Sequence, residues 1–148
     1  MSGLPPKLQD LLETLEMLPD RADRIQMLID LAERFEGVPE RVAARPYPEE
    51  HRVRGCESEA FVWAEPRNDG TVKLWYAVEN PQGVSAQSLA VILDRTLSGA
   101  SPEEIARVPS DVIYRIFGRE LSMGKSMGLM GMIGQTQVAA RRALAPAG

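Results

Sequence analysis

The chain has 148 residues, of which 44% are hydrophobic and 26% charged, and its net charge at pH 7 is −4. These values predict a single soluble globular domain over residues 1–148 and exclude a disordered chain. The negative charge argues against nucleic acid or an anionic membrane as a partner, because both attract basic proteins.

The amino-terminal residues lack the basic and apolar stretches of a secretory signal. No apolar run approaches the ~20 residues that a helix needs to cross a bilayer. We therefore expect a cytoplasmic protein without a membrane partner.

Two helices are predicted before residue 38. Leucines recur at the spacing of one helix face after Pro5 and Pro6, which suit a helix start, and the pattern ends at Pro19. Asp20 can cap a second helix, which Gly37 would end. The buried stripe of this second helix is expected to contain Ile25, Leu28, Ile29, Ala32 and Phe35. The two helices would form a hairpin, followed by an irregular connection over residues 38–50.

The hydrophobic period then changes to two, which predicts strands at residues 51–55, 59–65 and 71–78. Asp69 and Gly70 lie between the last two segments, and this pair tolerates the positive φ angles of a tight turn. These strands are therefore expected to be antiparallel.

The remaining chain is predicted to be helical, over residues 84–97, 101–108 and 111–117 and in a last helix that begins at Ser122 or Ser126. Ser101 and Glu104 have the spacing of a capping box. Helices, then strands, then helices predict an α+β fold. We expect a small antiparallel sheet of about three strands, with helices packed mainly on one face.

Cys56 is the only cysteine, and it lies between two predicted strands, so we expect it in a loop. Gly55 would let the chain turn there. The charges around the thiol compete, because Arg52 and Arg54 precede it while Glu57 and Glu59 follow it.

A single cysteine limits the chemistry that this chain can perform. It excludes an internal disulfide and the resolving thiol that a thioredoxin-like reductant needs. A scaffold that builds a cluster on its own chain normally needs several thiolate or imidazole ligands, and this chain has one cysteine and one histidine. We therefore expect no metal site and no cofactor. Carriage of sulfur as a persulfide remains, because no second thiol could displace that sulfur.

Three other interpretations remain open at this point. Cys56 could be a buried small hydrophobic residue, as free cysteines often are. It could instead pair with His51 as nucleophile and base of a single-thiol enzyme. A third possibility is a non-catalytic adaptor that binds a partner through the methionine-rich last helix.

The last predicted helix has two features that bear on the adaptor. Gly124, Gly128 and Gly131 share one face of it, which favours close packing against the rest of the protein. Met123 and Met127 are among the methionines around this face, and their flexibility would suit either gap filling or an irregular partner surface.

Val53, Gly55, Cys56 and Ser58, followed by an apolar strand from Ala60, resemble the V-x-G-C-x-S signature of SufE-like proteins. The resemblance extends to the amino-terminal helix pair, to residues 83–104 and to the run from residue 121 to residue 133, all in matching order and spacing. It implies a compact α+β protein of SufE/IscU-like fold.

The resemblance also implies a function. Cys56 would accept sulfane sulfur from a pyridoxal-phosphate-dependent, SufS-like cysteine desulfurase, stimulate that enzyme, and deliver the sulfur to a SufBCD-type scaffold for iron-sulfur cluster assembly. The chain would be an accessory sulfur-transfer protein rather than an enzyme itself. Arg54, Gly55, Glu57 and Ser58 would form the supporting loop.

Two departures from the family pattern stand out. The family often has glutamine where this chain has Glu57 and Glu59, and these carboxylates would disfavour the thiolate unless they point away. The family commonly has arginine where Lys125 stands, and lysine keeps the positive charge but lacks the planar guanidinium group. Lys125 is thus a possible partner contact.

Overall fold

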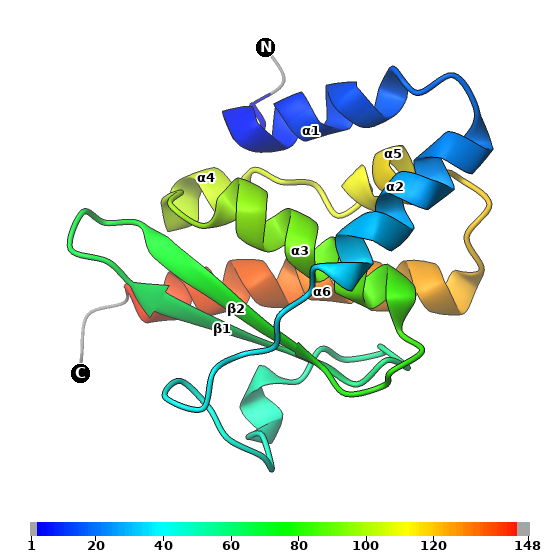
Figure 1. Ribbon diagram of the computed structural model, residues 1–148. Coiled ribbons are helices and arrows are strands. Elements are labelled where there is room, and N and C mark those ends of the chain that lie inside the picture. The colour runs from blue at the N-terminus through cyan, green and yellow to red at the C-terminus, as the bar shows by residue number, and fades with distance from the viewer. Residues whose placement is uncertain (1–2, 145–148) are drawn as a thin grey trace.

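The structure is a computed structural model that describes residues 3–144. These residues form a helical hairpin, a two-stranded antiparallel sheet and four further α-helices (Figure 1). The elements are α1 (Pro6–Glu16), α2 (Arg21–Glu33), the 3-10 helix η1 (Glu49–His51), β1 (Ala60–Pro66), β2 (Val72–Val78), α3 (Val84–Leu97), α4 (Pro102–Ala106), α5 (Val112–Phe117) and α6 (Met123–Ala143). The predicted α+β class is confirmed.

The prediction of about three strands is wrong by one. β1 pairs with β2 in the expected hairpin, with Trp63 opposite Trp75. Within the described residues, the segment 51–55 contributes only an isolated bridge between Arg52 and Phe61. This segment cannot form a longer strand, because η1 ends at His51 and the chain turns at Gly55, whose φ is +74°.

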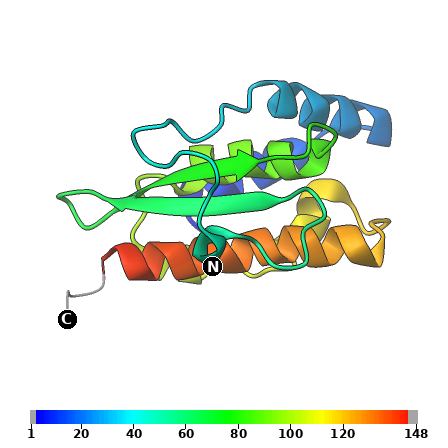
Figure 2. The ribbon, with the colours of Figure 1, turned by 90° about the horizontal axis from the view of Figure 1, so that it is seen from below.

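Helices cover one face of the sheet, as predicted. α6 runs behind the two strands in Figure 1, and α3 lies beside β2. The fully buried side chains of Val62 and Leu74 belong to the core on this side. Figure 2 shows the sheet between α6 and the connection that follows α2. Residues of that connection pack on the other face, where they form a small cluster with Phe61, Trp63 and Ala77.

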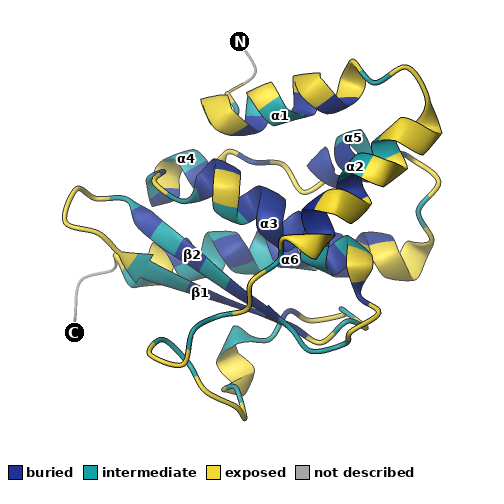
Figure 3. Ribbon diagram, viewed as in Figure 1, coloured by how far each residue is buried: buried dark blue, intermediate teal, exposed yellow. Residues whose placement is uncertain are grey.

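The buried stripe of α2 is rotated from the one predicted. Ile25 and Ile29 are exposed, at 45% and 37%. Leu28 and Ala32 are buried as predicted, and Leu31 is buried in addition, where α2 packs on α3. The sequence is apolar on both adjacent faces, so its periodicity alone does not determine which one meets α3. Figure 3 shows the exposed residues on the outward sides of α1 and α2 and the buried ones along α3 and β2.

The helix caps follow the sequence prediction. Ser101 and Glu104 form the capping box at the start of α4. The Ser122 side chain accepts a hydrogen bond from the Lys125 backbone N–H, so the earlier of the two predicted starts of α6 is the correct one.

α6 meets the segment that contains Cys56 through its glycine face. A Cβ atom on Gly131 would lie 2.9 Å from the carbonyl oxygen of Arg54, and one on Gly128 would lie 3.2 Å from Cα of Cys56. Real Cβ atoms do not approach a backbone oxygen as closely as the first of these distances. The predicted close packing of this face is confirmed, and only glycine permits it at Gly131.

We expect Gly131→Ala to destabilise the protein by about 1 kcal/mol, because overpacking against rigid backbone outweighs the gain in helix propensity. Gly134→Ala is the matched control on the same helix, since a Cβ there meets no atom within 4 Å. The control should stabilise the protein by about 0.5–1 kcal/mol. Urea unfolding measures both, and equal stabilisation by the two variants would contradict the close contact.

Candidate functional site

Cys56 lies in a tight turn between η1 and β1. The Val53 N–H donates to the Ala60 carbonyl at 2.8 Å, and the Glu59 N–H donates to the Cys56 carbonyl at 3.2 Å. Gly55 and Glu59 both have positive φ, +74° and +53°. Such a φ costs glycine little but is disfavoured for glutamate, so the surrounding contacts must hold Glu59 there. The predicted loop position of Cys56 is confirmed.

A second loop lies beside this turn. The Asn80 N–H donates to the Ser58 carbonyl at 3.1 Å, and the Glu79 N–H donates to the Glu59 carbonyl at 3.0 Å. A Cβ on Gly83 would lie 2.7 Å from the Ser58 hydroxyl oxygen. The turn is therefore fixed by the chain that connects β2 to α3 as well as by α6.

A hollow of about 240 Å³ opens beside Cys56. Its walls come from residues 56–58, from residues 80–86 and from the first two turns of α6. Cys56 is half-buried and packs against the main core. A water molecule occupies ~30 Å³ in the liquid, and a sulfur atom is of comparable size, so the hollow has room for sulfur added to the thiol.

The charges around the thiol are arranged by tertiary contacts. Arg52 donates from Nε to Glu49 Oε2 at 2.7 Å, and its guanidinium lies over the Phe61 ring. The hydrogen bond to Glu49 raises the pKa of Arg52. Arg52 is thus engaged outside the hollow, whereas Arg54 is exposed and forms no ion pair within residues 3–144.

The two glutamates that depart from the family pattern lie apart from each other. Oε1 of Glu57 is 3.7 Å from the position of a Cβ on Gly124, which places this carboxylate at the positive amino-terminal end of α6. Glu59 lines a different hollow, together with Arg45 and Arg52. Lys125 lines the hollow of Cys56.

His51 is placed for a structural role. Its Nδ1 lies 3.0 Å from the Val62 carbonyl oxygen, and its ring stacks on Trp63 with centroids 5.1 Å apart. Trp63 belongs to the cluster on the face opposite the helices, and His51 does not line the hollow of Cys56. This geometry gives no support to a Cys56–His51 pair.

Residues 3–144 contain no cluster of three or more histidine, cysteine, aspartate or glutamate side chains that could hold a metal ion. Among the helices of this part of the chain, none is both long and apolar enough to span a membrane.

Sequence reasoning missed the wall formed by residues 80–86. The sequence pattern places Asn80 and Gly83 between a predicted strand and a predicted helix and gives no sign that they lie beside Cys56. Their place beside Cys56 follows from the β1–β2 hairpin, which brings the end of β2 to the start of β1. The hairpin was predictable from the sequence, so the position of residues 80–86 beside Cys56 could have been inferred from it.

The comparisons with known proteins agree with this geometry. Residues 9–140 match the family described as "SufE: Fe-S metabolism associated domain". A solution structure of a hypothetical protein from Thermus thermophilus is similar in fold, with a TM-score of 0.71 and 28% identity over 95% of this chain and 98% of that one. No curated protein matches the sequence. Because the family match spans nearly the whole chain, this protein belongs to the SufE family and has a role in iron-sulfur metabolism.

Proposed function

We propose that Cys56 carries sulfur as a persulfide, which it receives from a pyridoxal-phosphate-dependent, SufS-like cysteine desulfurase and passes to a SufBCD-type assembly scaffold. The observation that carries this proposal is the position of the only cysteine, half-buried in a turn beside a hollow of about 240 Å³, in a chain of the SufE family. The cytoplasm suits this role, because a single thiol stays reduced there.

The transfer is a thiol–persulfide exchange. The Cys56 thiolate attacks the outer sulfur of the desulfurase's cysteine persulfide, and the S–S bond of that persulfide breaks. The enzyme's cysteine leaves as a thiolate and takes up the proton that Cys56 gave up. A persulfide then stands on Cys56, with no net oxidation or reduction. The same exchange toward a thiolate of the acceptor would deliver the sulfur.

The residues around Cys56 would support this exchange in different ways. Gly55 provides the left-handed turn that presents the thiol. Ser58 holds the turn against the second loop through its carbonyl. Glu57 is directed to the start of α6, which keeps its charge associated with the helix dipole. Arg54 is the nearest cation in sequence without an ion pair in the described chain, and it is available to a partner.

An exposed apolar rim beside the hollow fits the docking of the desulfurase. Met123 and Met127 are 80% and 59% exposed on the same turns of α6 that line the hollow, and Val84, on its opposite wall, is 44% exposed. Exposed methionines adapt to irregular partner surfaces. Contact here would bring the desulfurase persulfide close to Cys56.

The first prediction from this proposal concerns Cys56 itself. After incubation with cysteine and an active cognate desulfurase, intact-protein mass spectrometry should show the gain of at least one sulfur atom, reversed by reductant and absent from Cys56→Ser. The desulfurase should also turn over faster with the wild-type chain. An unmodified Cys56 and unchanged turnover, despite binding of the desulfurase, would reject the carrier and favour the adaptor.

The second prediction concerns the apolar rim. The double variant Met123→Gln, Met127→Gln should bind the desulfurase about tenfold more weakly in calorimetric titration, because it removes apolar area from the interface. Met17→Gln is a matched control, since Met17 is 82% exposed at the end of α1. If Met17→Gln weakens binding as much, the rim is not the docking surface.

The third prediction concerns Lys125. Lys125→Gln should lower the rate of sulfur transfer several-fold and reduce its sensitivity to salt, because one charge leaves the proposed interface. Lys7→Gln removes an exposed charge from α1 and should change neither quantity. Lys125→Arg should retain the salt sensitivity. A Lys125→Gln variant with wild-type rates at all salt concentrations would exclude the contact.

A further inference from the structure

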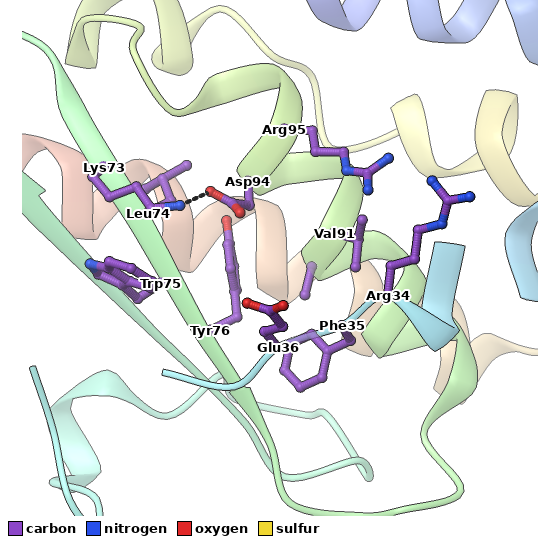
Figure 4. Close-up of a pocket in the computed structure, with 11 residues that line it drawn as sticks. Arg34, Phe35, Glu36, Lys73, Leu74, Trp75, Tyr76, Val91, Asp94 and Arg95 are labelled. Carbon is purple, nitrogen blue, oxygen red and sulfur yellow. Dashed lines mark hydrogen bonds and ion pairs between the residues drawn. The ribbon is translucent and has the colours of Figure 1, made fainter. Parts of the chain in front are cut away.

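A second hollow, of about 360 Å³, lies between the end of α2, the middle of β2 and the second half of α3 (Figure 4). Its lining residues, from 34–36, 73–76 and 90–95, are all different from those around Cys56. The proposed sulfur transfer makes no use of it. Its size falls within the range of roughly 300–1,000 Å³ that is usual for small-molecule sites.

One pair of charges in this hollow is compensated. Nζ of Lys73 forms an ion pair with Oδ1 of Asp94, and the same carboxylate oxygen accepts a hydrogen bond from the Ser98 hydroxyl at 2.7 Å. Figure 4 shows this ion pair on the β2 side of the hollow. It adds no net charge there.

Two further cations have no such compensation. Arg34 and Arg95 form no ion pair with any described residue, and Figure 4 shows both guanidinium groups on the side of the hollow away from Lys73. Glu36, the remaining acid of the lining, lies toward Tyr76 in the same view. The hollow therefore has a positive side, although the whole chain carries a net charge of −4.

Apolar side chains form part of the wall between these charged groups. Phe35 is half-buried, and it lines the hollow together with Ala90 and Val91 of α3. Planar guanidinium groups bind carboxylates and phosphates in a bidentate manner, and apolar walls favour a hydrophobic ligand body. The arginines and the apolar side chains together favour a ligand that combines an acidic group with an apolar body.

We propose that this hollow binds a small amphipathic organic anion, with its acidic group on Arg34 and Arg95 and its apolar or aromatic body against Phe35 and Val91. Three elements enclose the space, which suits a small molecule better than the flat surface of a folded protein. Glu36 would repel a second acidic group on the opposite side, so the ligand is expected to carry its charge at one end.

The test uses 1-naphthylacetate as the probe and 1-naphthylacetamide as its uncharged analogue. Titration into the ¹⁵N-labelled full chain should shift the amide signals of residues 34–36, 74–76 and 90–95 in a saturable way, with a dissociation constant of about 1 mM or lower. The amide should bind at least about tenfold more weakly, because it lacks the charge-assisted hydrogen bonds.

Variants then test the two arginines. Arg34→Gln combined with Arg95→Gln should weaken binding of 1-naphthylacetate about tenfold or more without unfolding the chain, since both side chains are exposed. Arg107→Gln combined with Arg141→Gln removes two exposed charges elsewhere and should leave binding unchanged, as should Cys56→Ser. Absence of saturable binding, equal affinity for the amide, equal loss in the control pair, or shifts centred on Cys56 would each overturn the proposal.

Discussion

The position of Cys56 depends on contact between two backbones, that of α6 and that of the turn at residues 54–56. At Gly131 and Gly128 the helix has no side chain, so the Arg54 carbonyl and Cys56 Cα lie where a Cβ would make tight contact. Backbone atoms cannot change rotamer, which makes such a contact less adaptable than one between side chains. The same helix supports β1 from behind, so the sheet and the cysteine turn share one support. The turn is placed by the helix more than by its own sequence.

Charge pairs on the opposite face of the sheet complement this arrangement. Arg41 binds Glu65 and lowers its pKa, while the hydrogen bond to Glu79 raises the pKa of Arg45. These pairs attach the connection between α2 and β1 to the strands, over the aromatic cluster that includes Tyr47. Arg52 belongs to the same system through Glu49. Arg52, four residues before Cys56, therefore has a structural role. The charged residues that remain near the hollow are Arg54, Glu57 and Lys125.

Sequence reasoning succeeded where a pattern is local. Leucine spacing, the capping box at Ser101 and the turn at Gly70 each depend on neighbouring residues, and the structure has all three. It failed where several local solutions compete. The segment 51–55 alternates like a strand but becomes η1 and a turn, and α2 buries Leu31 rather than Ile25 because α3 determines which face is covered. The directions of Arg52 and Glu57 depend on tertiary contacts, with Phe61 and with α6, and no periodicity encodes them.

The way the cysteine turn is held bears on how a carrier could both keep and release sulfur. A persulfide that stood free in solvent would react with any passing thiol, whereas transfer requires a partner's sulfur to reach it. Within residues 3–144, the turn at 54–57 is joined to α6 by packing and not by hydrogen bonds. The Cys56 carbonyl accepts from the Glu59 N–H, and the flanking Val53 N–H donates to Ala60 of β1. Displacing the turn from α6 would therefore leave no polar group of the helix unsatisfied. Shelter in the hollow and exposure to a docked desulfurase would then differ by the loss of van der Waals contact and of the attraction between Glu57 and the amino-terminal end of α6, both of which the contacts of the partner can replace.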